Sequence, residues 1–154
     1  PRIRLADVAG TARLAAALAA AARPGDVIGL SGPVGAGKTT FARAFVQALD
    51  PSVDEVPSPT FTLVQTYDTP RGELWHVDAY RLETAEEAME LGLEDAFAGA
   101  ICLVEWPERI EAVLPASRLS VTLGADGSES ARIATLRAGP GWEDRIARIV
   151  SDVG

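Results

Sequence analysis

Apolar residues gather in short blocks along this chain, and the period of each block predicts a strand or a helix. Two five-residue blocks, Val27–Ser31 and Ile101–Glu105, are largely apolar, as is typical of strands buried on both faces of a sheet. Apolar residues recur at helical spacing after Thr39 up to residue 49, and Asp50-Pro51 ends that pattern. Residues 11–22, rich in alanine and leucine, predict an N-terminal amphipathic helix.

The rest of the chain alternates between strand and helix patterns. Residues 61–67 alternate as a strand, residues 69–72 form a turn, and residues 73–78 run back, which predicts an antiparallel hairpin. Residues 84–98 predict an acidic helix with a break near Gly92. Two later strands at about 118–123 and 131–137 and a closing helix at 141–150 complete the expected elements.

The loop between the first buried strand and the following helix carries the clearest motif. It reads Gly32-Pro33-Val34-Gly35-Ala36-Gly37-Lys38-Thr39, the spacing of a phosphate-binding loop. Glycines allow a tight loop whose backbone N–H groups face a phosphate, and the next helix begins there with free N–H groups. Lys38 then suits the β- and γ-phosphate oxygens, and the Thr39 hydroxyl suits Mg²⁺. The sequence therefore predicts a nucleotide site.

These elements predict one fold. We expect residues 1–154 to form a single domain of the α/β class. The expected architecture is a three-layer sandwich like that of P-loop NTPases, with a mixed, mostly parallel sheet that includes the antiparallel hairpin.

Candidate chemical groups lie at the ends of the predicted strands and in one loop. Glu105 ends a buried strand, where an acidic group meets Mg²⁺ or its waters. Asp78 ends the hairpin and could orient a water or contact the metal shell. Thr60 lies in the proline-rich connection 51–60, where a switch threonine would sense the γ-phosphate, although a capping role stays open. The sole histidine, His76, is interpreted as a hydrogen-bonded structural residue, although a catalytic role stays open.

Charge and composition narrow the partners and the compartment. The 154-residue chain has a net charge of −8, and its arginines are isolated along the sequence, so any role in RNA chemistry is expected to run through protein partners. No segment is long enough to span a membrane. Residues 14–22 resemble a signal-peptide core, but cleavage there would remove a helix from the nucleotide domain, so we expect a cytoplasmic protein. The single cysteine, Cys102, is expected to be buried and inert.

The lack of asparagine and the single lysine indicate which nucleotide base the site accepts. The chain has no asparagine, and its one lysine is in the phosphate loop, so a guanine-specifying Asn-Lys-x-Asp box is impossible. We therefore expect ATP, with Mg²⁺, rather than GTP.

Several motifs together resemble one family. In order, they are Gly32–Thr40, Ser58-Pro59-Thr60-Phe61, the His76–Leu82 segment HVDAYRL, Leu91-Gly92 and the Leu103–Arg109 segment LVEWPER. From about Leu5 to Leu136 the chain resembles TsaE, the ATPase component of bacterial threonylcarbamoyladenosine (t6A) tRNA modification. The HVDAYRL and LVEWPER segments are far more specific to that family than the phosphate loop itself.

The resemblance implies roles for individual residues. Lys38, Thr60 and Asp78 would be catalytic, and Thr39 with Glu105 would hold Mg²⁺. Trp106 would pack beside the site and Thr11 would lie near the adenine. Family members often carry an arginine beside a glycine in the late hairpin, where it reaches the nucleotide. The stretch from Gly127 to Arg132 departs from that pattern, and Arg132 is the stand-in for this role. The residues expected at the nucleotide are Thr11, Gly35, Ala36, Gly37, Lys38, Thr39, Thr40, Asp78, Trp106 and Arg132.

The resemblance also implies partners and a task. TsaE proteins act with TsaB and TsaD, whose complex attaches threonylcarbamoyl to adenosine 37 of tRNAs that read ANN codons, so tRNA would be contacted only indirectly. The ATPase would be slow alone and stimulated by that complex. Two other classes stay open from the residues: a small-molecule kinase, and a nucleotide-dependent binding module with negligible hydrolysis.

Overall fold

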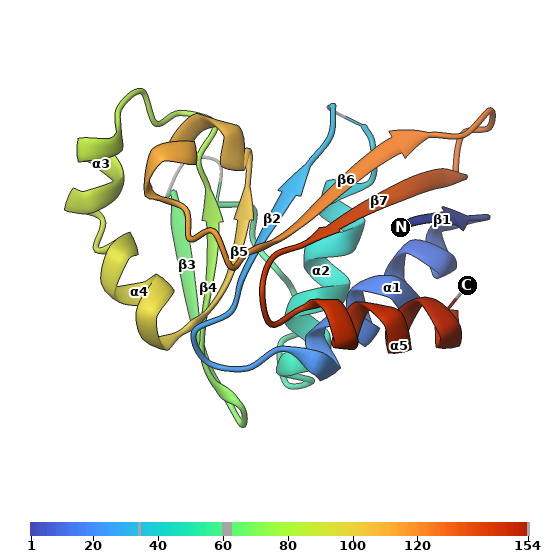
Figure 1. The fold of residues 1–154 in the computed structure, drawn as a ribbon, viewed down its shortest axis with the longest axis horizontal. Helices are drawn as coiled ribbons and strands as arrows, with labels where there is room; N and C mark the ends of the chain where they lie inside the picture. The colour runs from blue at the N-terminus through green and yellow to red at the C-terminus, as the bar shows by residue number, and fades with distance from the viewer. Residues whose placement is uncertain (34, 60–62, 154) are drawn as a thin grey trace.

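The computed structural model describes residues 1–33, 35–59 and 63–153, and a seven-stranded sheet runs through them (Figure 1). Its strands are β1 (Arg2–Leu5), β2 (Val27–Ser31), β3 (Val64–Thr69), β4 (Gly72–Asp78), β5 (Ile101–Glu105), β6 (Leu119–Ala125) and β7 (Arg132–Ala138). The helices are α1 (Val8–Ala21), α2 (Lys38–Leu49), α3 (Ala85–Glu90), α4 (Leu93–Gly99), the 3₁₀ helix η1 (Pro107–Val113) and α5 (Glu143–Val153).

The centre of the sheet is parallel and both edges are antiparallel. The strand order is β1-β7-β6-β2-β5-β4-β3, and the neighbouring strands β6, β2, β5 and β4 run parallel. The predicted hairpin is present, because β3 pairs antiparallel with β4. In the parallel part Leu30 lies opposite Glu105, which in turn lies opposite Asp78. The carboxyl ends of β2, β4 and β5 therefore meet at one edge of the sheet.

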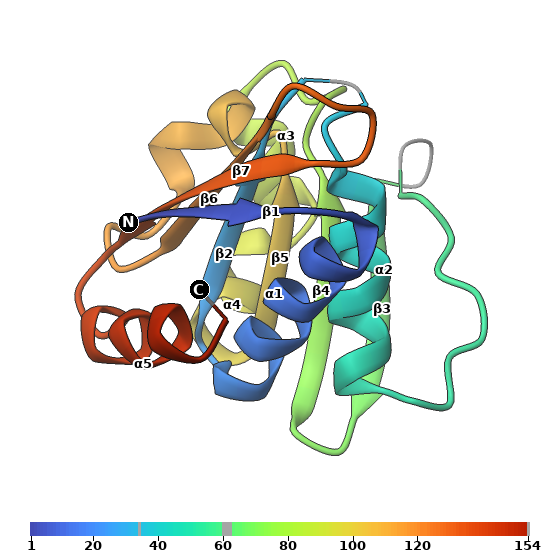
Figure 2. The same ribbon diagram turned by 90° about the vertical axis from the view of Figure 1, so that its right-hand side faces the viewer.

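Helices cover both faces of the sheet, so the predicted three-layer α/β sandwich is confirmed. Helices α1, α2 and α5 lie on one face, as Figure 2 shows, and α3, α4 and η1 lie on the other. Two apolar cores result, one around Leu14 and Phe41 and the other around Leu93 and Val104. Helix α2 is the next element after β2, and the phosphate loop connects the two.

Several bounds differ from those the sequence predicted. Helix α1 begins at Val8, three residues before the expected start, because the Asp7 side chain accepts a hydrogen bond of 2.8 Å from Gly10 N and caps it. Strand β3 is described only from Val64, and residues 61 and 62 of the expected strand lie outside the described residues. The predicted break at Gly92 separates α3 from α4. None of the helices in the described ranges has both the length and the hydropathy needed to cross a bilayer.

Two elements were not predicted from the sequence at all. Strand β1 has four residues, too few for alternation to be distinguished from chance, and it forms by antiparallel pairing with β7. Helix η1 starts at Pro107, whose fixed φ suits the first helical position.

Candidate nucleotide site

The phosphate loop joins the end of β2 to the first turn of α2, and its glycines are structurally required. Gly32 has φ of 146°, and a Cβ there would lie 2.6 Å from the carbonyl oxygen of Leu123. Gly37 is the N-cap residue of α2, in the left-handed region with φ of 101°, and as a glycine it offers no side chain to the first N–H groups of this helix. The helix therefore presents free N–H donors and the positive end of its dipole at the loop, as phosphate binding requires.

Lys38 is the first residue of α2, and its side chain is nearly buried. Its Nζ atom donates a 2.5 Å hydrogen bond to the carbonyl oxygen of Gly32 and lies 3.6 Å from the centroid of the Trp106 ring. Burial lowers the pKa of the Lys38 ammonium, and the negative charges of Glu105, Glu108 and Asp78 partly offset that effect. The ammonium is thus held by one carbonyl and one aromatic face, both of which a phosphate oxygen can replace.

A cavity of about 420 Å³ opens beside this loop, and it brings most of the predicted residues together. It is lined by Gly35, Gly37, Lys38, Thr39, Thr40, Ser58, Asp78, Glu105, Trp106 and Arg132. Ser58 was not assigned a role from the sequence, although it precedes Pro59-Thr60 in a motif that resembles the family.

Three predicted residues do not line the described cavity. Ala36 belongs to the phosphate loop and is buried at 4% exposure, and Thr11 is buried in α1 at 2% exposure. Thr60, the predicted switch residue, lies outside the described residues. Their expected roles at the nucleotide stay predictions.

The two predicted carboxylates are neighbours in the sheet. Asp78 ends β4 and Glu105 ends β5, and their Cα atoms are partners in the parallel register. Both side chains are largely buried yet line the cavity. One oxygen of Asp78 accepts a 2.9 Å hydrogen bond from the backbone N–H of Tyr80, which fixes the orientation of that carboxylate.

His76 lies behind Glu105 and holds it. Its Nε2 atom is 2.7 Å from Oε2 of Glu105, and since a carboxylate only accepts, Nε2 carries the donated hydrogen. His76 is 2% exposed and does not line the large cavity, and its Nδ1 has no partner in the described part of the chain. The structural role of His76 is therefore to orient one oxygen of Glu105, so that the other oxygen can face a ligand.

Arg132 reaches the phosphate loop from β7. Its Nε donates to the carbonyl oxygen of Ala36 and its Nη2 to that of Gly35, each at 2.9 Å. The guanidinium therefore braces two consecutive loop carbonyls and also forms part of the cavity wall. The two hydrogen bonds join residues that are 96 and 97 positions apart in the sequence. The local spacing of apolar and polar residues gives no information about contacts over such a separation.

Trp106 also lines the cavity and lies beside Lys38. Its backbone is in the left-handed region with φ of 57°, a conformation that costs a bulky residue free energy and recurs at functional sites. The ring packs against Tyr80 at a centroid distance of 4.9 Å, and the guanidinium of Arg109 lies 5.0 Å from the Tyr80 ring. The bend at Trp106 thus turns its ring from β5 onto the Lys38 ammonium.

Comparison with known proteins identifies the family. A family model described as threonylcarbamoyl adenosine biosynthesis protein TsaE matches residues 5–134. The chain belongs to the TsaE family. It is 40% identical over 134 residues to a Bacillus subtilis protein named tRNA threonylcarbamoyladenosine biosynthesis protein TsaE, covering 86% of this chain and 83% of that relative. A Rickettsia bellii protein of the same name is 42% identical over 113 residues, 73% of this chain and 78% of the relative.

A solved structure agrees with the sequence relatives. The crystal structure of YdiB from Bacillus subtilis superposes with a TM-score of 0.80 and 31% identity, over 100% of this chain and 96% of that one. The fold and the family resemblance predicted from the sequence are both confirmed.

Proposed function

We propose that this TsaE-family protein is a Mg²⁺-dependent ATP hydrolase that serves t6A modification of adenosine 37 in tRNAs reading ANN codons. The observation that carries the proposal is the single cavity in which Lys38, Thr39, Asp78 and Glu105 converge at the carboxyl edge of the sheet. Relatives named for tRNA threonylcarbamoyladenosine biosynthesis support the pathway. Such a reaction belongs to the cytoplasm, where tRNA and ATP are available.

The residues present fit a nucleotide with Mg²⁺. The described residues contain no group of three or more acidic, histidine or cysteine side chains that could hold a metal alone. That is the arrangement Mg²⁺ favours in nucleotide sites, since it uses one or two protein oxygens together with phosphate oxygens and water. Thr39 and Glu105 would hold the ion, which would neutralise charge on the phosphates.

The protein groups then divide the remaining work. Lys38 exchanges the Gly32 carbonyl and the Trp106 ring for the β- and γ-phosphate oxygens, and the N–H groups of the first turn of α2 add further donors. Asp78, already oriented by Tyr80 N–H, accepts a hydrogen bond from the attacking water and aligns it. His76 keeps Glu105 in place throughout.

Hydrolysis by the isolated chain is expected to be slow. The wall of the cavity offers one arginine, Arg132, and it already donates to Gly35 and Ala36, so added stabilisation of the transition state has to come from elsewhere. We propose that a TsaB–TsaD-type complex supplies it by acting on the switch segment that contains Thr60, with tRNA contacted only through that complex.

The test is phosphate release measured against the concentration of a TsaB–TsaD-type complex. We expect low basal release that rises with the complex, and Thr60→Ala should lose the stimulation. A flat response at saturating complex would favour the binding-module interpretation, and phosphate appearing on an added small acceptor would favour a kinase. A thermal scan with ATP and with GTP, each with Mg²⁺, tests the base: we expect ATP to raise the Tm further.

A further inference from the structure

A second cavity, of about 330 Å³, lies between α1 and α5 and is lined by four arginines. These are Arg23, Arg71, Arg145 and Arg148, and the one carboxylate that joins them is Asp152. They come from the α1–β2 connection, the β3–β4 hairpin and α5, so residues that are isolated in the sequence gather in space. We call this the arginine cavity. Four of the thirteen arginines of an acidic chain meet there.

The arginine cavity is separate from the nucleotide site. Arg23 and Asp26 precede β2, whereas the phosphate loop follows it, so the two sites lie at opposite ends of this strand. In Figure 1 the hairpin that carries Arg71 points to the bottom of the view and the β2–α2 loop to the top. Five residues at about 3.3 Å each separate the two ends by roughly 16 Å.

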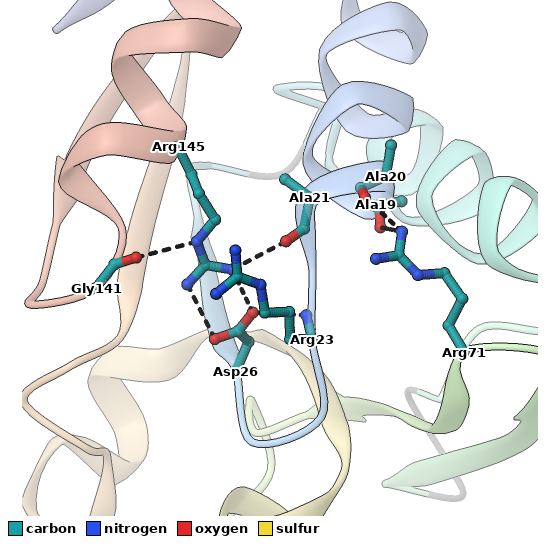
Figure 3. A network of polar contacts seen from close by, with 8 residues as sticks. All are labelled: Ala19, Ala20, Ala21, Arg23, Asp26, Arg71, Gly141 and Arg145. Carbon is teal, nitrogen blue, oxygen red and sulfur yellow. Dashed lines mark hydrogen bonds and ion pairs between the residues drawn. The ribbon is translucent and has the colours of Figure 1, made fainter.

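Arg145 is a scaffold of the arginine cavity. It is 8% exposed, and its Nη1 and Nη2 atoms donate to the two carboxylate oxygens of Asp26 at 2.6 and 3.2 Å. It also donates to the carbonyl oxygens of Ala21 and Gly141, as Figure 3 shows, and it stacks on Trp142 at 3.6 Å. Its charge is matched by Asp26, so Arg145 fixes the wall of the arginine cavity and adds little net charge to it.

Only one nitrogen of the Arg71 guanidinium donates hydrogen bonds within the described residues. Its Nη1 atom donates to the carbonyl oxygens of Ala19 and Ala20, which holds the hairpin against the last turn of α1 (Figure 3). Its Nε and Nη2 atoms have no hydrogen-bond acceptor within the described ranges. The guanidinium is therefore oriented by the protein while part of its donor set stays available.

Arg23 and Arg148 are exposed, and neither forms an ion pair within the described residues. Among residues 1–33, 35–59 and 63–153, no carboxylate oxygen lies within 4.0 Å of either guanidinium, or of Arg71. The guanidinium of Arg148 makes one long contact, 3.5 Å from Nε to the carbonyl oxygen of Asp144 in its own helix. Three cations that form no ion pair within the described residues thus share one cavity with a single carboxylate, Asp152, in a chain whose net charge is −8.

From this arrangement we infer that the arginine cavity binds a phosphate group. Guanidinium donors match the oxygens of phosphate and carboxylate groups by paired hydrogen bonds. Two guanidiniums saturate the two oxygens of a planar carboxylate, whereas three from separate segments suit a tetrahedral phosphate. A free or small-molecule phosphate agrees with the indirect contact to tRNA proposed above. The backbone of an RNA has the same recognition chemistry and is the other source, which the test distinguishes.

The test uses the full chain with its nucleotide site saturated by Mg·ADP. Inorganic phosphate is titrated at constant ionic strength, and binding is followed by NMR on the arginine Nε–Hε resonances. The variant is Arg23→Gln with Arg148→Gln, since neither side chain ties two elements together. The control is Arg2→Gln with Arg137→Gln, which removes the same charge from two exposed positions at the β1–β7 edge.

We expect saturable shifts in the wild type and the control, and affinity weaker by about tenfold or more in the double variant, because two charge-assisted donors are lost. ADP affinity should be equal in all three proteins, and Lys38→Ala should leave phosphate binding in the arginine cavity unchanged. No saturable shift in the wild type, or equal affinity in the double variant, overturns the inference. Should the double variant fail to fold, Arg148→Gln alone is judged by the same criterion.

A second arm identifies the source of the phosphate. A fluorescent RNA stem-loop is titrated into the same proteins. Binding that is lost in the double variant and kept in the control assigns the phosphate to an RNA backbone. Saturable inorganic phosphate without RNA binding assigns it to a free or small-molecule phosphate. Neither result depends on ATP hydrolysis, so a failure here is distinguishable from a failure of the proposed ATPase function.

Discussion

Lys38 is the only lysine of the chain, and its ammonium lies against the Gly32 carbonyl and the Trp106 ring. We predict that Lys38→Ala abolishes ATP binding and leaves the apo fold intact, because α2 keeps its Gly37 cap and its apolar face. The measurement is the Tm shift caused by Mg·ATP. In the wild type a hundredfold excess over Kd adds about 2.7 kcal/mol, a shift of roughly 5–10 °C.

The matched control for this prediction is Arg13→Ala, which removes one positive charge from an exposed position on α1. Its Tm shift with Mg·ATP should equal that of the wild type. A normal shift in Lys38→Ala would contradict the assignment of the loop.

Substitution of the two buried carboxylates, Glu105 and Asp78, should impair different properties of the protein. Glu105→Ala should weaken the Mg²⁺ dependence of nucleotide binding, because Glu105 lines the cavity and is held there by His76. Asp78→Ala should lower the rate of hydrolysis more than ATP affinity, because its proposed role is to align water. Affinity and phosphate release are measured for both variants across a Mg²⁺ titration. Equal loss of binding in both would place Asp78 in the metal shell.

At the residue scale, sequence patterns predict what is local. The spacing of Gly32, Gly37 and Lys38 predicted the loop correctly, because it depends on backbone conformation within eight residues. The hydrogen bond from His76 to Glu105 joins two strands and depends on the sheet register, which one sequence does not specify. Arg132 was placed at the site by resemblance alone, and its donation to the loop carbonyls was not foreseen.

At the scale of elements, the phosphate loop is held by its neighbours as well as by its glycines. Strand β7 contributes Arg132, whose two hydrogen bonds brace Gly35 and Ala36. We predict that Arg132→Ala weakens ATP binding by about tenfold, or about 1.4 kcal/mol, since each lost hydrogen bond contributes about 1 kcal/mol. Calorimetric titration with Mg·ATP measures it.

The comparison variants for Arg132 lie on the same strand. Arg137→Ala changes an exposed arginine of β7 and should leave ATP affinity unchanged. Arg132→Lys should restore part of the affinity, because an ammonium can reach one carbonyl and lacks the planar fork that holds two. Full affinity in Arg132→Ala would show that the loop keeps its shape without the brace.

The accuracy of the predicted elements follows their burial. Strands β2 and β5 were predicted with their observed bounds, because strands buried on both faces read as continuous apolar runs. The edge strand β1 was missed, since its four residues form a strand only by pairing with β7. Its existence depends on tertiary context, as is usual for edge strands.

At the scale of the whole molecule, parallel strands divide the chemistry between two ends of the sheet. The carboxyl ends of β2, β4 and β5 carry the phosphate loop and both carboxylates. The opposite end of β2 carries the arginine cavity, built from segments more than a hundred residues apart. No sequence pattern predicts that cavity, because its arginines meet only when α5 packs against α1.

A buried thiol on strand β5 also gives a measure of global stability. Cys102 lies in the middle layer with no exposed surface, and burial, with a smaller effect of Glu73, raises its pKa from 9.0 to about 12. Between these two values the unfolded thiol ionises while the folded one stays protonated, so the free energy of unfolding falls as pH rises. We predict that the wild type loses about 1.4 kcal/mol from this source between pH 8 and pH 10.

Cys102→Ala should lack that loss, even though the smaller side chain lowers stability at every pH. Burial also raises the pKa of Tyr67, but this contribution is common to both proteins and cancels in the comparison. Urea unfolding of each protein at pH 8, 9 and 10 gives two curves of stability against pH, and the wild-type curve should fall more steeply. Parallel curves would mean that the thiol reaches water without global unfolding, in which case it would also react with a thiol reagent in the native state.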